Sequence, residues 1–173
     1  MLQEFVRGLS EKSRYYRFAS SLRELSVPVL VKYTLIDYDL EMALVAVQTL
    51  RTPGADGGFV EAERILGVSR YIANPDDSSG EFSLVVDDRF SGQGLGTRLM
   101  LAIMDVARDK GLKELNGLVL VKNSGMLKLM ASWGSRSGLT RRISTSGCVR
   151  RHCEVAECGV ERRLTPRSGP WQR

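Results

Sequence analysis

Three glycines at positions 92, 94 and 96 limit the folds open to this chain more than any other segment, because they stand between a predicted strand and a predicted helix. Glycine has no Cβ, so the backbone can turn tightly there and successive N–H groups can point at one anion. The positive end of the helix dipole adds to that attraction. The segment therefore predicts either a pyrophosphate cradle or a tight strand-to-helix turn without a ligand.

The segments around the glycines have clear hydrophobic periods. Three short helices are predicted within residues 1–36, with Ser10 as the N-cap of the second. The apolar run at 42–50 predicts a strand buried on both faces. Further strands are expected at 65–73, 81–86 and 115–121, and helices at 97–110 and 124–132. Because turns join the first three strands, we expect an α+β fold with a mixed, mostly antiparallel central sheet flanked by helices.

The position of the glycines separates the phosphate-binding folds from one another. A dinucleotide fingerprint follows the first strand of a parallel βαβ unit, and a Walker loop ends in Gly-Lys-Ser/Thr. Here the glycines follow three antiparallel strands and lead into Thr97-Arg98. Neither of those two folds fits this chain.

The composition is typical of one globular domain, with 43% apolar and 26% charged residues among 173. The net charge of +5 comes from the C-terminal part, where nine arginines and three glutamates lie from Gly134 onward. The remainder is nearly neutral, which argues against nucleic-acid binding. No apolar run is long enough to cross a bilayer and no signal segment opens the chain, so we expect a cytoplasmic protein without a membrane partner.

The three cysteines, Cys148, Cys153 and Cys158, lie near the C-terminus. Their odd number is typical of reduced thiols rather than of a disulfide framework. With His152, the only histidine, they lack the CxxC spacing of a zinc knuckle. No bound metal is therefore expected.

The residues Ser91-Gly92-Gln93-Gly94-Leu95-Gly96 resemble the motif Gln/Arg-x-x-Gly-x-Gly/Ala of the GNAT superfamily of acetyl-CoA-dependent acetyltransferases. Ser91 departs from the motif's first position, and Gln93 is a candidate replacement. Four further segments resemble the acetyltransferase domain that bacterial protein-lysine acetyltransferases carry fused to acyl-CoA-synthetase-like regions. These segments are residues 5–10, 13–18, 36–39 and 81–86. The resemblance covers roughly residues 1–134 and implies a GNAT-like fold and acetyl-CoA as co-substrate.

The resemblance also implies roles for particular residues. Glu81 takes the place of the family's catalytic glutamate and would accept the proton of the attacking amine. Its alternative role is that of a solvent-facing strand residue. The backbone N–H groups of Leu84, Val85 and Val86 would stabilise the thioester oxygen. The remaining residues implied in acetyl-CoA binding are Gly92, Gln93, Gly94, Leu95, Gly96, Thr97, Arg98 and Asn123.

Other positions bear on catalysis and on the acceptor. Asn123 is either a contact to the CoA arm or simply the N-cap of its helix. Met130 stands where the family often has a tyrosine that protonates the leaving thiolate. The acceptor wall is assigned by the resemblance to Tyr15, Tyr16, Asp37 and Tyr38.

We therefore expect an N-acetyltransferase acting on protein lysines. The alternatives are an acyl-CoA-binding regulatory module without turnover, which Ser91 and Met130 favour, and an enzyme acting on an N-terminus or a small amine. Residues 135–173 form an atypical basic tail whose low apolar content predicts poor ordering. Without that tail the strand at 115–121 would keep an open edge, which favours dimerisation.

Overall fold

The computed structural model describes residues 1–53, 57–76, 78–133, 142–143 and 148–154. Its core is a six-stranded sheet in the order β1-β2-β3-β4-β6-β5, and only the β3–β4 pair is parallel. This topology confirms the expected α+β fold. The strands are β1 (Glu41–Pro53), β2 (Phe59–Ala73), β3 (Ser79–Val86), β4 (Glu114–Leu120), β5 (Arg142–Ile143) and β6 (Cys148–Glu154). The helices are α1 (Leu2–Gly8), α2 (Glu11–Phe18), α3 (Val27–Thr34), the 3-10 helix η1 (Asp88–Phe90), α4 (Leu95–Asp109) and α5 (Ser124–Trp133).

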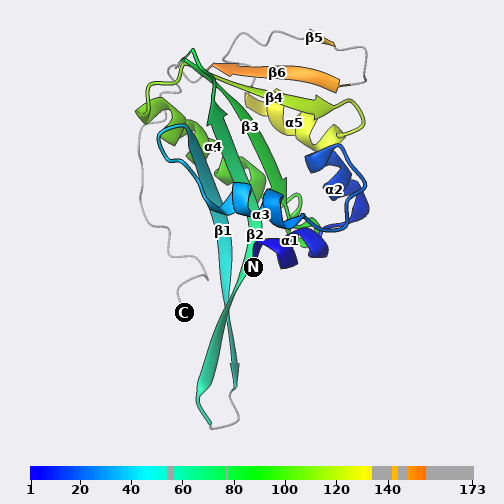
Figure 1. Cartoon of the computed structure of the whole chain (residues 1–173). Coiled ribbons are helices and arrows are strands. Elements are labelled where there is room, and N and C mark those ends of the chain that lie inside the picture. The colour runs from blue at the N-terminus through cyan, green and yellow to red at the C-terminus, as the bar shows by residue number, and fades with distance from the viewer. Residues whose placement is uncertain (54–56, 77, 134–141, 144–147, 155–173) are drawn as a thin grey trace.

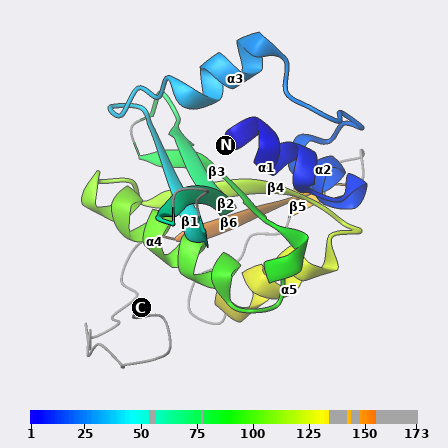
Figure 2. The same cartoon turned by 90° about the horizontal axis from the view of Figure 1, so that it is seen from below.

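Helices cover both faces of the sheet. Figures 1 and 2 show α4 and α5 on one face and α1, α2 and α3 on the other. On α4, the buried side chains of Met100, Ile103, Met104 and Ala107 recur at spacings of three and four, as the sequence predicts. They pack with residues from β2, β3 and β4 into one core cluster, and a second cluster joins the first three helices to the opposite face.

Arg70 attaches α3 to the sheet. It lies on β2 with only 3% of its surface exposed and forms an ion pair with Glu41 of β1. Its guanidinium also donates to the carbonyl oxygens of Lys32 and Tyr33, which belong to the last turn of α3. Burial lowers the pKa of Arg70 from its ordinary value. The ion pair with Glu41 and the two carbonyls offset part of the cost of burying this charge, and Arg70 Nε is buried without a hydrogen-bond partner among the described residues.

The prediction that the strand at 42–50 is buried on both faces is wrong. β1 is an edge strand, and its side chains of Val45 and Val47 are 46% and 48% exposed. Met42 and Leu44 pack against the α4 core, whereas the two valines line an apolar cavity of about 450 Å³ beneath α3. The strand is apolar on both faces because one face contacts the core and the other borders this cavity.

The strand at 115–121 does not keep the open edge expected of it without the tail, because β6 from the segment after Gly134 lies beside it. β4 pairs antiparallel with β6 over its whole length, from Glu114–Glu154 to Leu120–Cys148. Backbone hydrogen bonds form this pairing, and they do not require large apolar side chains. The low apolar content of residues 135–173 was therefore no guide to whether a strand would form there.

Gly117 on β4 is required by close packing against Phe82. A Cβ at this position would lie 2.5 Å from two carbons of the Phe82 ring, which is itself buried in the core. We therefore expect Gly117→Ala to lower the free energy of unfolding by about 1 to 3 kcal/mol, the usual cost of overpacking a core. Denaturant unfolding measures this difference. Gly8→Ala is the control, because a Cβ at Gly8 meets no atom within 4 Å; equal stability of both variants would contradict tight packing at Gly117.

Candidate active site

The parallel ladder between β3 and β4 is short. It runs from Ser79–Glu114 to Glu81–Asn116, whereas β3 continues to Val86 and stays paired with β2 on its other side. The two described strands are therefore not paired with each other beyond Glu81. A gap lined by the unpaired edge of β3 opens between them.

Strand alternation decides which amides of β3 face this gap. The N–H of Asp87 donates to the carbonyl oxygen of Leu66 in the β2 segment, at 2.8 Å. Because successive residues of a strand point their N–H groups to opposite sides, the N–H of Val85 also faces β2. The N–H groups of Leu84 and Val86 then face the gap. Of the three predicted donors, the register directs two toward the gap and one away from it.

The glycine turn leads directly into α4. Gly92 and Gly94 have φ angles of +77° and +81°, and a Cβ on either would meet no atom within 4 Å. This positive φ favours glycine, and the space beside it is open. Gly96 lies one turn further on, where a Cβ would be 3.6 Å from Leu84 and 3.7 Å from Val86. The start of α4 is thus adjacent to the edge of β3 that faces the gap.

Among the described residues, the first backbone N–H groups of α4 have no hydrogen-bond partner within their helix. Gly94 is the N-cap and supplies no side-chain hydrogen bond, and the first recorded bond within the helix runs from Arg98 N to Gly94 O at 3.1 Å. The N–H groups of Leu95, Gly96 and Thr97 therefore lack partners within the helix. Three donors at the positive end of the helix dipole suit a phosphate group.

Gln93 has a local role in this turn. Its side-chain nitrogen donates to the carbonyl oxygen of Arg89 at 3.0 Å. The side chain therefore braces the turn against η1. Ser91, at the first motif position, and Arg98, in the first turn of α4, are both solvent-accessible.

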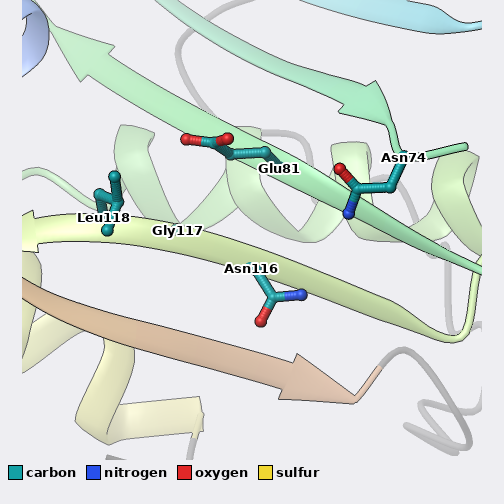
Figure 3. Close-up of a pocket in the computed structure, with 5 residues that line it drawn as sticks. All are labelled: Asn74, Glu81, Asn116, Gly117 and Leu118. Carbon is teal, nitrogen blue, oxygen red and sulfur yellow. The ribbon is translucent and has the colours of Figure 1, made fainter. Parts of the chain in front are cut away.

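Glu81 lies at the last pair of the β3–β4 ladder, in a small cavity of about 60 Å³. Its neighbour Phe82 packs into the α4 core, so Glu81 points to the opposite face, the one that carries α1, α2 and α3. Figure 3 shows Glu81 on β3 and Asn74 at the end of β2, with Asn116, the ladder partner of Glu81, on β4. Gly117 and Leu118 complete the lining. The carboxylate is exposed and accessible from solvent.

Asp88, which sequence analysis missed, connects the site to the N-terminal helices. Its carboxylate accepts hydrogen bonds from Ser10 N, Ser10 Oγ and Ser13 Oγ at 2.8, 3.0 and 2.7 Å. Ser10 is also the N-cap of α2, as predicted, and its Oγ accepts from Ser13 N. The sequence signal for this site was the pair Asp87-Asp88 just before the glycine turn, because Asp is a common helix-capping residue. Asp87 caps η1 in that way, accepting from Arg89 N at 3.0 Å.

Asp88 should make stability depend on pH. Burial raises the pKa of Asp88, but the hydrogen bonds from Ser10 and Ser13 outweigh it and hold the pKa below the ordinary value of 3.8. A carboxyl group with a lowered folded pKa stabilises the protein above its unfolded pKa, and this contribution is lost as pH falls through the folded value. Asp88→Asn should therefore cost about 1 kcal/mol near pH 7, and less in acid.

The measurement for Asp88 is chemical unfolding at several pH values. Asp105→Asn is the matched control, since Asp105 makes a surface ion pair with Arg108 on α4. Such exposed pairs contribute little. A cost at Asp88 that does not change between neutral and acid pH would contradict the role of its charge.

Comparison with known proteins agrees with this geometry. Residues 28–134 match the sequence model of the acetyltransferase (GNAT) family. The chain belongs to the GNAT family of acetyltransferases. Members of this family use acetyl-CoA as the acetyl donor, and the glycine turn with the free donors of α4 suits its pyrophosphate.

Individual relatives extend the comparison. An acetyltransferase of Pseudomonas aeruginosa is 30% identical over 132 residues, covering 76% of this chain and 66% of the relative. The GNAT domain of S. lividans PAT superposes with a TM-score of 0.69 at 25% identity, over 88% of this chain and 82% of that one. A cAMP-binding acyltransferase from Mycobacterium smegmatis shares the fold with a TM-score of 0.53 at 24% identity, over 84% of this chain and 40% of that one. The chain thus spans about two thirds of the Pseudomonas relative and less than half of the mycobacterial protein.

The structure separates the four residues that the GNAT resemblance assigns to the acceptor wall. The hydroxyl of Tyr16 donates to the carbonyl oxygen of Lys122 at 2.7 Å, which anchors α2 at the β4–α5 turn, and Tyr15 is 44% exposed. Asp37 accepts from the N–H of Asp39 within its own turn. Tyr38 lies next to it, and its carbonyl oxygen accepts from Lys110, at the end of α4. None of the four lines the Glu81 cavity within the described chain.

Asn123, just before α5, and Met130, within α5, have clear structural roles. The side-chain oxygen of Asn123 accepts from the N–H of Met126 at 3.1 Å, which confirms it as the N-cap. Met130 is fully buried in the α4 core, so its side chain cannot approach a leaving group.

Membrane-spanning helices and metal-ligand clusters are both absent from the part of the chain that the structure describes. There, no helix has the length and apolar character needed to cross a bilayer. The same residues contain no cluster of potential metal ligands. The side chains of His152, Cys148 and Cys153, and the whole of Cys158, lie outside what the structure describes.

Proposed function

We propose that this GNAT domain transfers the acetyl group of acetyl-CoA to the side-chain amine of protein lysines. One observation carries the proposal: the exposed carboxylate of Glu81 stands where the β3–β4 ladder ends, on the same strand as the gap-facing amides of Leu84 and Val86. A proton acceptor and two donors for a developing oxyanion therefore lie along one strand edge. The turn at Gly92 and Gly94 follows the C-terminal end of this strand, β3.

Glu81 would act as the general base. A lysine amine has a pKa of about 10.4 and arrives protonated at neutral pH. Transfer of one proton to Glu81, directly or through water, frees the nitrogen lone pair to attack the thioester carbon. The new N–C bond forms as the C–S bond breaks, and the departing thiolate takes up, through solvent, the second proton that the nitrogen loses to become an amide. A thiol of pKa about 8.5 leaves readily, which is consistent with Met130 in place of a tyrosine acid.

The remaining roles follow from the backbone. The N–H groups of Leu84 and Val86 would stabilise the negative charge on the thioester oxygen, because donors fixed by the backbone need little reorganisation. The N–H groups of Leu95, Gly96 and Thr97 would hold the pyrophosphate at the start of α4. Under this proposal Glu81 is the base, the backbone amides of β3 bind the oxyanion, and the backbone amides at the start of α4 bind the pyrophosphate.

A second candidate function is binding of acyl-CoA without turnover. Ser91 at the first motif position and the buried Met130 favour it. Release of free CoA thiol from acetyl-CoA, followed with lysine peptides, peptides with free N-termini and small amines, distinguishes the candidates. We expect thiol release with lysine peptides whose N-termini are blocked. Binding of acetyl-CoA without thiol release from any amine would favour the regulatory module, and release only with free N-termini or small amines would reassign the acceptor.

The wider setting is also proposed. We place the acetyltransferase motifs within residues 1–134 and treat residues 135–173 as a basic segment that adds β5 and β6 to the edge of the same sheet. A cytoplasmic location fits the cysteine pattern and supplies both protein lysines and acetyl-CoA.

A further inference from the structure

We infer that Asn74 is a second acceptor-binding residue of the Glu81 cavity: its side-chain oxygen accepts a hydrogen bond from the substrate's amine, and Ser79 and Asp76 orient it for that task. This inference rests on the proposed function, because it concerns the amine that Glu81 deprotonates. It begins from a chain of hydrogen bonds in the turn between β2 and β3.

The direction of each hydrogen bond in this turn follows from Asp76. Hydrogen bonds from the backbone and side chain of Ser78 and Ser79 lower the pKa of Asp76, which is therefore ionised at neutral pH and only accepts. The hydroxyl of Ser79 must then donate to Asp76 Oδ2, at 2.8 Å. That leaves the Ser79 oxygen to accept from Asn74 Nδ2, also at 2.8 Å. The nitrogen of the Asn74 amide is thus committed to Ser79.

The oxygen atom of the Asn74 amide, by contrast, is not used in a hydrogen bond within this turn. Among the described residues, the Asn74 Oδ1 atom accepts no hydrogen bond. Ser79 is 7% exposed, so the amide cannot turn over without leaving a buried hydroxyl poorly paired. The carbonyl oxygen of the Asn74 side chain is therefore held in one orientation and is available to a ligand.

The register brings this oxygen to the cavity of the proposed base. Asn74 N donates to Ser79 O at 2.8 Å, just beyond the pairs Ala73–Gly80 and Ile72–Glu81. Strand alternation places Asn74, Ser79 and Glu81 on the same face of the sheet. Asn74 and Glu81 both line the cavity of about 60 Å³, as Figure 3 shows.

The two side chains together favour a slender cation. A protonated primary amine has three N–H donors and no acceptor, and it keeps two donors after losing one proton. Asn74 can therefore hold the amine before and after Glu81 removes its proton. The small cavity suits an unbranched alkylamine, such as the end of a lysine side chain, better than a branched or aromatic amine.

The test is steady-state kinetics of the full chain with acetyl-CoA and a lysine peptide with a blocked N-terminus. Asn74→Ala should raise the KM for the peptide roughly tenfold, as expected for loss of a hydrogen bond to a charged group. Ser79→Ala should raise it by about threefold, because the amide is then free to rotate. Asn74→Asp keeps an acceptor oxygen toward the cavity and should restore the KM to within about threefold of the parent. The KM for acetyl-CoA should stay unchanged in all three.

One control variant changes a hydroxyl far from the cavity. Ser132→Ala, which removes a hydroxyl bonded within α5, should leave both KM values unchanged. A peptide KM for Asn74→Ala within about twofold of the parent would overturn the inference, as would an equal rise in the KM for acetyl-CoA. If Asn74→Ala does not fold, Ser79→Ala decides the matter, because a peptide KM within about twofold of the parent would then overturn the inference. A near-parental peptide KM for Asn74→Asp would support it. A parent protein that acetylates no amine would instead overturn the proposed function.

Discussion

Glu81→Gln should lower turnover with saturating lysine peptide on the order of 100-fold, the usual contribution of a positioned general base. The amide has nearly the same size as the carboxylate but cannot accept the amine's proton at neutral pH. Affinity for acetyl-CoA should barely change, because the anion cradle at the start of α4 is formed by other residues. Initial rates at saturating peptide and a binding isotherm for acetyl-CoA measure the two quantities.

The matched control is Glu63→Gln. Glu63 is an exposed glutamate on β2, paired with Thr49 in the outer part of the hairpin. It should retain parental turnover. If Glu81→Gln turned over as fast as the parent, Glu81 would be a solvent-facing strand residue, and the proton would be accepted elsewhere.

Gly94→Asp should abolish stabilisation of the fold by acetyl-CoA. A ligand that binds only the folded state at roughly a hundredfold excess over its dissociation constant adds about 2.7 kcal/mol to the free energy of unfolding. At Gly94 a new carboxylate would enter the open space beside the free N–H groups of α4 and repel the pyrophosphate. Thermal unfolding with and without saturating acetyl-CoA measures the difference for each protein.

Gly57→Asp separates the backbone effect from the charge effect. Gly57 also has a positive φ, +78°, and a Cβ there would meet no atom within 4 Å, but it lies in the β1–β2 hairpin. Both variants introduce an aspartate at such a position, so both should lose some intrinsic stability. Only Gly94→Asp should lose the response to acetyl-CoA. An equal response in the two variants would remove the glycine turn from the binding site.

The local elements of this protein were predictable because their signals lie within a few residues of each other. The helical spacing of Met100, Ile103 and Met104 predicted α4 and its buried face. Ser10 and Asn123 were predicted as N-caps, and each accepts the expected backbone hydrogen bond. The glycines of the 92–96 segment predicted the strand-to-helix turn, and two of them have the positive φ that this turn requires.

The errors concern residues whose surroundings come from distant segments. Apolar residues on both faces of β1 predicted full burial, but only the tertiary structure shows that Val45 and Val47 border a cavity beneath α3. Low apolar content predicted poor ordering after Gly134, whereas β6 from that segment pairs with β4 through backbone groups that do not depend on apolar side chains. Amino-acid composition does not predict which strands pair with each other.

The sequence by itself determined the helices, most of the strands, the glycine turn and the family resemblance, since each depends on short-range spacing. The tertiary structure alone decided where the β3–β4 ladder ends, and this end selects Leu84 and Val86 rather than Val85 as the amides that face the gap. It also brought Asn74 and Glu81 into one cavity. The physical reason is that strand register and ladder length depend on hydrogen bonds between segments far apart in the chain, and no local pattern encodes where two strands separate.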